Sequence, residues 1–253
     1  MPLLLLLIAA ALAGLTVALL ARRVPAAAVV PKPAEGTRPH LKPEAVRGAA
    51  LALALAVMVA GGVLLAVLTF VIRDVEGGLG VDVAVGEWGR DHATDATDAV
   101  LEAMTFCGAP STVAVMAVLV GLEETLRTRS RWVIPYLAAV VAGTGVLTTT
   151  IKELAERVRP ELDPIAATLG PSFPSGHSSW SAAFFAAAAL LLSRGRPRRT
   201  RIALAGVGAG CAVAVAATRV LLGVHWLSDV LAGLALGWAW FAACTILFGR
   251  RSG

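Results

Sequence analysis

The stretch GAALALALAVMVAGGVLLAVLTFVI, residues 48–72, runs for 25 residues without a charged side chain. A bilayer core about 30 Å thick requires about 20 apolar residues in a helix, because each residue adds about 1.5 Å. Six further apolar blocks reach or approach this length, at 2–21, 109–122, 132–151, 177–192, 202–222 and 226–248. The block at 109–122 is short, and we expect its helix to extend back through Val100, Leu101, Met104 and Phe106. The sequence therefore predicts an all-α, multi-pass membrane protein.

The composition supports a membrane protein and disfavours other classes. Hydrophobic residues make up 57% of the 253 residues, and only 15% are charged, against about 25% in an average soluble domain. The mean hydropathy is +0.77, which excludes a disordered chain and makes a soluble globular domain a poor description. Three cysteines without a C-x-x-C pair give neither a disulfide framework nor a zinc site.

The basic residues are concentrated in alternate connections between the apolar blocks. Connections 22–47, 123–131, 194–201 and 250–251 carry six, three, five and two Lys or Arg residues, 16 of the 22 in the chain. The other connections, 73–98 and 152–176, carry eleven acidic and five basic side chains. The positive-inside rule places the first group and the C-terminus in the cytoplasm and the second group outside. Topology thus explains the net charge of +5, and we expect no nucleic-acid partner.

The first apolar block has the charge order opposite to that of a signal peptide. No Lys or Arg precedes it, and Arg22 and Arg23 follow it. We therefore expect three parts: a transmembrane helix at 1–21, a cytoplasmic Pro- and Ala-rich linker at 22–47, and a six-helix membrane domain at 48–249. Two small-residue pairs in the last two apolar blocks, Gly206-x3-Gly210 and Gly233-x3-Gly237, indicate close helix packing.

Three polar motifs lie at the outer ends of apolar blocks, and the first is KELAERVRP, residues 152–160. Lys152 and Arg159 are seven residues apart, which is about two helical turns, so both cations can share one face of a helix. Pro160 disfavours helix at the preceding residue and is expected to mark the helix end. Taken alone, both cations could simply extend to the lipid headgroups.

The second motif is PSGH, residues 174–177, directly ahead of an apolar block. Ser175 is a candidate N-cap, and Gly176 permits close approach of the backbone to a ligand. The helix start would then present free N–H groups and its positive dipole end, which together bind anions. His177 lies at this opening and can exchange a proton near neutral pH. An ordinary capped helix with an incidental histidine is the alternative.

The third motif is TRVLLGVHWLSD, residues 218–229. Arg219 is the only charge in the block 202–222, and His225 and Asp229 are four residues apart, on one face if they lie on a helix. A carboxylate that accepts from one imidazole nitrogen fixes the tautomer and leaves the other nitrogen with an exposed lone pair. The alternative is a structural ion pair that joins two helices.

Together the three motifs place Lys152, Arg159, Arg219, one helix N-terminus and two histidines at one membrane face. Three cations around a helix N-terminus favour a multiply charged anion, for which phosphate is the obvious candidate. The two histidines can supply a nucleophile and a general acid. No Asp/Glu cluster suited to Mg²⁺ accompanies them, so we expect no metal and no cofactor.

At these residues the sequence resembles the type 2 phosphatidic acid phosphatase superfamily, whose pattern is K-x6-RP, PSGH and SR-x5-H-x3-D. The resemblance covers about residues 48–249 and leaves out the first block and the linker. It implies that His225 attacks phosphorus and forms a phosphohistidine, that Asp229 orients His225, and that His177 protonates the leaving group. Thr218 stands where the family usually has Ser, which leaves the role of this hydroxyl open.

The resemblance also implies a phosphate cradle and a substrate class. Lys152, Arg159 and Arg219 would hold the phosphoryl oxygens, and the Ser175 side chain and Gly176 N–H would complete the cradle. We expect hydrolysis of a lipid phosphate or lipid diphosphate monoester at the outer leaflet. Phosphatidic acid, phosphatidylglycerol phosphate and undecaprenyl diphosphate all fit, with a slight preference for the last or for broad specificity. Membrane lipids are the expected partners, and nothing in the sequence indicates a protein partner.

Other functions are compatible with several membrane helices and buried charge. A transporter or channel would place its ionisable groups near the bilayer midplane, whereas here they lie at one end. Vanadate-dependent haloperoxidases have a similar site, but they are soluble. A non-catalytic relative that only binds through the charged cluster is a further alternative.

Overall fold

The computed structural model describes residues 4, 10–16, 43–73, 75, 78–160 and 170–249, and these are almost entirely helical. The helices are α2 (Pro43–Ile72), α3 (Gly80–Asp91), α4 (Asp95–Phe106), α5 (Pro110–Thr128), α6 (Val133–Ala155), α7 (Gly176–Leu192), α8 (Arg198–Leu221) and α9 (Leu227–Gly249). Residues 10–16 are helical as well. The described part of the chain contains no strand, so the all-α prediction is confirmed.

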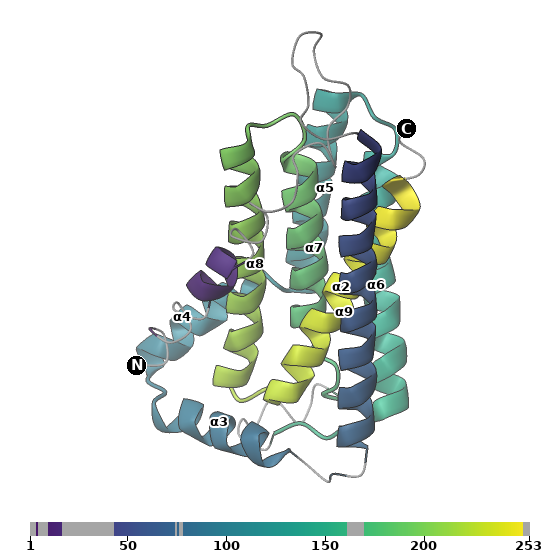
Figure 1. Cartoon of the computed structure of the whole chain (residues 1–253). Coiled ribbons are helices and arrows are strands. Elements are labelled where there is room, and N and C mark those ends of the chain that lie inside the picture. Colours follow the sequence, from purple (N-terminus) through teal and green to yellow (C-terminus); the bar gives the residue numbers. More distant parts are fainter. Residues whose placement is uncertain are drawn as a thin grey trace.

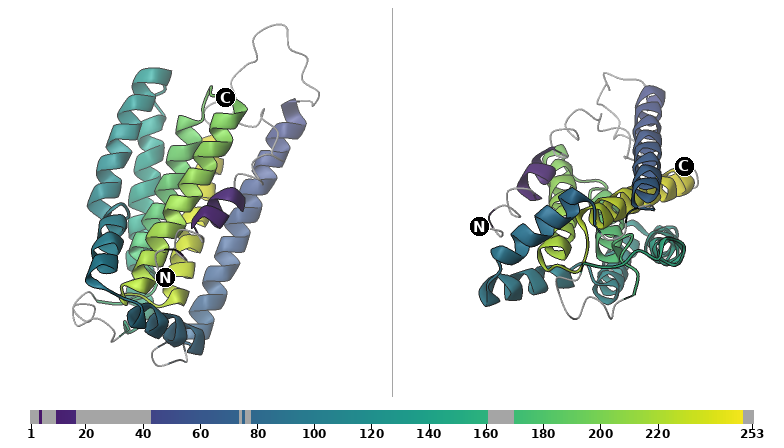
Figure 2. Two further views of the ribbon diagram at one scale, coloured as in Figure 1. Left: turned by 90° about the vertical axis from the view of Figure 1, so that its left-hand side faces the viewer. Right: turned by 90° about the horizontal axis from the view of Figure 1, so that it is seen from below.

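The long helices form an upright bundle around α7 (Figures 1 and 2). Helix α7 packs against α5, α6, α8 and α9, and α2 packs along α9 at the rim. The sequence of α7, GHSSWSAAFFAAAALLL, is apolar or small on every side, as expected for a helix that is surrounded by other helices. The bundle thereby buries the helix that begins with the PSGH motif.

Both small-residue pairs lie at close backbone contacts, which confirms the packing prediction. A Cβ on Gly233 would lie 2.6 Å from the carbonyl oxygen of Ser175, and one on Gly237 would collide with the carbonyl of Ser179. Gly206 and Gly210 of α8 lie against the helical residues 10–16. Because glycine has no side chain, α9 can approach the first turns of α7 closely enough to contact its backbone.

Among the described residues, four helices are long and apolar enough to cross a membrane: α6, α8, α9 and residues 51–72 of α2. Helices α4 and α5 meet this test only as a pair, and they are bent by 47° to each other at a short break. Pro110 is at the start of α5, where its missing N–H is not needed. The sequence had indicated one helix through this region, and the break corrects that expectation. Helix α7 is apolar but shorter, with 17 residues.

The connection 73–98 contains helix α3, which the sequence analysis had not predicted, and the start of α4, whose residues 100–106 it had expected to be helical. Helix α3 crosses the lower end of the bundle in Figure 1 and packs against α8 and α9, and α4 begins within the same connection. The buried residues of α3 are Asp82, Gly86 and Gly89, which lie on one face of the helix. Helix α3 therefore covers the bundle end at which the three motifs lie.

The opposite end of the bundle carries a buried carboxylate, Glu124, with its side chain fully enclosed. Arg127 donates to both of its oxygens at 2.7–3.0 Å and also to the Arg194 carbonyl at 2.9 Å. These contacts tie the end of α5 to the connection between α7 and α8.

Most of the expected N-terminal helix and linker lies outside the described residues. Helix α2 begins at Pro43, five residues before the expected start of the six-helix domain at residue 48. The division into parts 1–21, 22–47 and 48–249 remains a prediction.

Candidate active site

Four helix termini meet at the end of the bundle that α3 covers. Lys152 lies in the last turn of α6, His177 in the first turn of α7, Arg219 in the last turn of α8 and Asp229 in the first turn of α9. Arg159 and His225 come from the connections that follow α6 and α8. The structure thus brings charged residues from distant parts of the sequence to one place.

His225 and Asp229 form the expected pair, and both are buried, with 4% and 0% of their surface exposed. The distance from His225 Nδ1 to Asp229 Oδ2 is 3.4 Å. His225 precedes α9, which begins at Leu227, so the two residues do not share a helix face as predicted. The pair forms because the chain enters α9 over the Asp229 side chain, whose Oδ2 also accepts from the Trp226 N–H at 3.0 Å.

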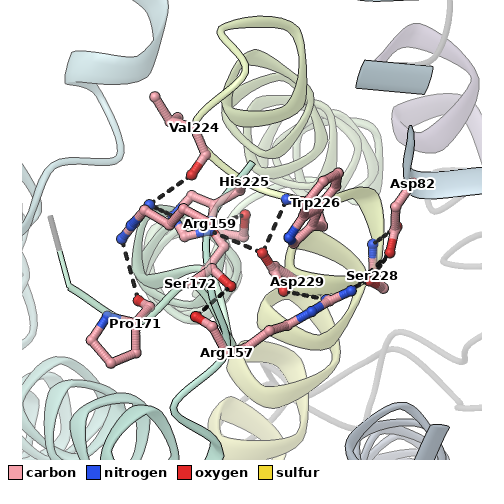
Figure 3. A network of polar contacts seen from close by, with 12 residues as sticks. Asp82, Arg157, Arg159, Pro171, Ser172, Val224, His225, Trp226, Ser228 and Asp229 are labelled. Carbon is pink, nitrogen blue, oxygen red and sulfur yellow. Dashed lines mark hydrogen bonds and ion pairs between the residues drawn. The ribbon is translucent and has the colours of Figure 1, made fainter. Parts of the chain in front are cut away.

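The other nitrogen of His225 faces Arg159 (Figure 3). Arg159 Nη1 lies 3.1 Å from His225 Nε2 and donates to the Val224 carbonyl at 2.7 Å. A guanidinium only donates, so Nε2 is the acceptor and Nδ1 carries the proton that points to Asp229. Burial lowers the pKa of His225 to about 4, although the hydrogen bond to Asp229 acts in the opposite direction. The imidazole is therefore neutral at pH 7, with the lone pair of Nε2 directed at a cation.

Lys152 and Arg159 meet at the same carbonyl oxygen, that of Pro171. The Lys152 ammonium donates to it, and Arg159 Nη2 donates to it at 3.3 Å. Helix α6 ends at Ala155, because Glu156 adopts a left-handed conformation with φ of 44°. The predicted shared helix face, and a helix end set by Pro160, are therefore wrong. The cations converge because the chain after Glu156 turns back across the helix end.

The PSGH motif lies where the sequence placed it, with Gly176 as the first residue of α7. Ser175 is the N-cap residue, but its side chain does not cap the helix, since its Oγ accepts from the Ser178 hydroxyl at 3.0 Å. The Ser175 N–H donates to the Asp229 carbonyl at 3.0 Å, which joins the motif to α9. The positive end of α7 consequently faces the site.

His177 and Arg219 complete the set. The positive charges of Arg219, Arg159 and Lys152 all act on the His177 imidazole, so His177 lies within electrostatic reach of each of these cations. Arg219 is 8% exposed, and its Nη1 donates to Thr105 of α4 at 3.0 Å. The Thr218 hydroxyl donates to the Val215 carbonyl within its own helix, so it is occupied in α8.

Two charged residues of this region were missed by the sequence analysis, Arg157 and Asp82. Arg157 donates to Asp229 Oδ1 at 2.6 Å and to Asp82 Oδ2 at 3.0 Å, and all three side chains are buried. The R-x-R spacing before Pro160 could have indicated Arg157. Asp82 shares a helix face with Gly86 and Gly89, and a carboxylate on a small-residue face was the available signal.

The arrangement can bind and react with an anion. Cations and a helix N-terminus surround a neutral imidazole whose second nitrogen faces a carboxylate, which suits phosphoryl transfer to nitrogen. A pocket of about 250 Å³ next to the site is lined by residues 156–160, Gly170 and Pro171, so of the groups above it includes Arg159 and neither histidine. Among the described residues, no three His, Cys, Asp or Glu side chains are grouped to hold a metal ion. The expectation of metal-free chemistry remains a prediction.

Fold and site together define a multi-pass α-helical membrane protein with a cationic, histidine-bearing site at one end of its bundle. The chain belongs to the PAP2 superfamily, whose family model matches residues 132–252. The curated phosphatidylglycerophosphatase B of Bacillus subtilis is 33% identical over 140 residues, 54% of this chain and 68% of that protein. The resemblance to the phosphatidic acid phosphatase superfamily is thereby confirmed.

Other relatives extend the comparison. Lipid A 1-phosphatase of Rhizobium johnstonii is 39% identical over 147 residues, 52% of this chain and 56% of that protein, so the match spans little more than half of it. The crystal structure of the transmembrane PAP2-type phosphatidylglycerolphosphate phosphatase from Bacillus subtilis superimposes with a TM-score of 0.67 at 26% identity. It covers 76% of this chain and 96% of that one.

Proposed function

We propose that this protein hydrolyses a lipid phosphate or lipid diphosphate monoester without a metal ion, through a phosphohistidine at His225. The observation that carries the proposal is the pair of contacts on the His225 ring. Nδ1 faces Asp229 at 3.4 Å, and Nε2 lies 3.1 Å from Arg159. A phosphoryl oxygen held by that guanidinium would bring phosphorus to the lone pair of Nε2.

In the first step, His225 Nε2 forms a bond to phosphorus while the bond to the leaving oxygen breaks. The leaving oxygen takes a proton from His177, whose imidazolium form would be stabilised by the negative charge of the bound phosphate. The imidazole of the phosphohistidine then carries positive charge, which the Asp229 carboxylate stabilises through the Nδ1 proton. In the second step, water attacks phosphorus, His177 takes its proton, and the P–N bond breaks to restore neutral His225.

Each of the remaining site residues has a role in this scheme. Lys152, Arg159 and Arg219 neutralise the phosphoryl oxygens, and the Ser175 hydroxyl and the Gly176 N–H add hydrogen-bond donors at the N-terminus of α7. The Ser175 hydroxyl accepts from Ser178, so its own proton is available to an oxyanion. The residues of the site would thus supply the charge neutralisation that a metal supplies elsewhere.

The position of the site and the names of the relatives support this substrate class. The charged residues lie at helix termini, where the phosphate of a lipid would lie if its tail remained in the bilayer. The names of the relatives include lipid A 1-phosphatase, phosphatidylglycerophosphatase B and decaprenylphosphoryl-5-phosphoribose phosphatase. Each of these names describes a phosphatase that acts on a phosphorylated lipid, and we propose a phosphorylated lipid as the substrate of this chain as well. Undecaprenyl diphosphate belongs to this class.

We further propose that the site faces the extracytoplasmic side and that the C-terminus is cytoplasmic. The basic connections 123–131 and 194–201 lie at the opposite end of the bundle from the site. In a variant whose three native cysteines, at 107, 211 and 244, are replaced, single cysteines placed at Glu156 and at Arg199 should be labelled by a membrane-impermeant maleimide in intact cells only at position 156. Labelling only at position 199 would reverse the orientation.

The test of the activity is phosphate release from a panel of lipid phosphates by detergent-solubilised protein, with and without EDTA. Turnover should be unaffected by EDTA and should be lost in His225→Gln. A protein that binds the lipids but releases no phosphate would be a non-catalytic relative. Full activity in His225→Gln would refute the assignment of the nucleophile.

A further inference from the structure

Asp229 lies directly behind the proposed nucleophile His225, and two further buried charges, Arg157 and Asp82, lie on the far side of Asp229. Asp82, Arg157 and Asp229 are 1%, 6% and 0% exposed and come from α3, from the connection after α6 and from α9. Figure 3 shows Arg157 extended between the two carboxylates. Burying three charges is costly unless they are paired, so their arrangement requires an explanation.

Arg157 contacts the oxygen of Asp229 that His225 does not use. Its Nη1 donates to Asp229 Oδ1 at 2.6 Å and to the Ser228 hydroxyl at 2.7 Å, and its Nη2 donates to Asp82 Oδ2 at 3.0 Å. Asp229 Oδ2 remains directed at His225 Nδ1. The two oxygens of Asp229 thus have separate partners, and the carboxylate cannot rotate without losing the contact to Arg157.

Asp82 holds the same turn from the other side. Its Oδ1 accepts from the Ser228 N–H at 2.8 Å, and its Oδ2 accepts from the Ser228 hydroxyl at 2.6 Å. Oδ2 also accepts from the Leu79 N–H at the start of its own helix, at 3.0 Å. One carboxylate therefore joins the N-terminus of α3 to the first turn of α9, next to Asp229.

The charges decide what this arrangement does for His225. Arg157 and Asp229 alone would form a neutral pair, which stabilises an imidazolium poorly. With Asp82 the group carries a net charge of −1, the charge that a lone Asp229 would have. The positive charges of Arg159 and Lys152 disfavour a positive charge on His225. A net negative charge on its other side is therefore needed to stabilise the ring when it becomes cationic.

We propose that Asp82 and Arg157 are positioning residues for phosphoryl transfer: Arg157 fixes the Asp229 carboxylate, and Asp82 compensates the charge of Arg157 so that Asp229 can stabilise the His225 imidazolium. This inference rests on the proposed phosphohistidine mechanism. It assigns to α3 a role in catalysis, although α3 carries none of the three motifs.

The first test compares Asp82→Asn with Asp91→Asn, an exposed carboxylate on the same helix, which changes the net charge equally. Asp82→Asn should lower kcat about 10- to 100-fold, the usual effect of removing a carboxylate that orients a residue of the site without touching the substrate. KM should change less than threefold, since Asp82 does not touch the phosphate site. Asp91→Asn should behave as wild type. A wild-type kcat in Asp82→Asn would overturn the proposal.

The second test separates charge compensation from a structural role. The double variant Asp82→Asn/Arg157→Gln restores the net charge of −1 while it removes further hydrogen bonds. Charge compensation predicts that its kcat exceeds that of Asp82→Asn, even if its melting temperature is lower. A purely structural clamp predicts a kcat equal to or below that of Asp82→Asn, which would overturn the proposal.

The outcomes also distinguish this inference from the proposed function. Wild-type turnover that depends on His225, together with a normal kcat in Asp82→Asn, would refute only the positioning role. Wild-type protein without His225-dependent turnover would overturn both. If the double variant does not fold, the kcat and KM of Asp82→Asn against Asp91→Asn still decide the matter.

Discussion

Replacing Gly233 by alanine should test whether the site depends on the close contact of α9 with α7. The new Cβ would lie 2.6 Å from the Ser175 carbonyl oxygen and 2.9 Å from Ser178 Cβ. An ordinary contact needs at least 3.4 Å, so the two helices must separate by about 0.8 Å. The hydrogen bond from the Ser175 N–H to the Asp229 carbonyl, now 3.0 Å, would be broken by this shift.

The shift moves the N-terminus of α7 relative to the His225–Asp229 pair. A misplacement of about 1 Å can cost about 100-fold in rate, so kcat/KM should fall about 100-fold in a phosphate-release assay. Overpacking should also lower the free energy of unfolding by about 1–3 kcal/mol, measured by thermal unfolding in detergent. Gly62→Ala is the matched control, because a Cβ on Gly62 meets nothing within 4 Å. A folded Gly233→Ala protein with wild-type kcat/KM would refute the account of the cradle.

Three further predictions address individual groups. Burial lowers the pKa of His225 to about 4 in the folded protein, against 6.5 for an ordinary histidine. Between these two pH values the unfolded chain therefore binds a proton at His225 more tightly than the folded protein does. Wild type should accordingly lose stability as the pH falls from 6.5 to 4. Melting curves of His225→Gln should lack this part of the loss, and identical curves would contradict the lowered pKa. Arg159→Lys keeps the positive charge but removes the guanidinium, whose separate N–H groups contact His225, Val224 and Gly170. The value of kcat/KM should therefore fall about 10- to 100-fold. An unchanged value would show that the positive charge alone suffices. Glu124→Gln should lower the stability by about 1–2 kcal/mol without changing kcat or KM, because Glu124 lies at the opposite end of the bundle; altered kinetics would contradict this separation.

The apolar blocks and the three motifs predicted the helical fold and the members of the site because each depends on local sequence. A run such as residues 51–72 has no stable arrangement in a bilayer except a helix. The PSGH motif begins α7 as expected, and His225 pairs with Asp229 as expected, although not through a shared helix face. These features follow from periodicity, from helix-end chemistry and from the family motifs.

Other features depend on contacts between distant segments, which no local pattern reports. Helix α6 ends at Ala155, before the left-handed Glu156, rather than at Pro160, and Arg157 and Arg159 then extend toward α9. In the sequence, Asp82 is one of seven acidic residues in the connection 73–98, and no local pattern shows what it contacts. Its partner Ser228 lies 146 residues further along the chain, so only the folded structure identifies the pair.

The most direct test of the central claim is to trap the covalent intermediate. A lipid phosphate labelled with ³²P at its terminal phosphate should transfer the label to wild-type protein during rapid mixing. The phosphoprotein should be stable in alkali and labile in acid, as a phosphoramidate is, and peptide mapping should place the label on His225. His225→Gln should acquire no label. Label on another residue, or continued turnover in His225→Gln, would contradict the account.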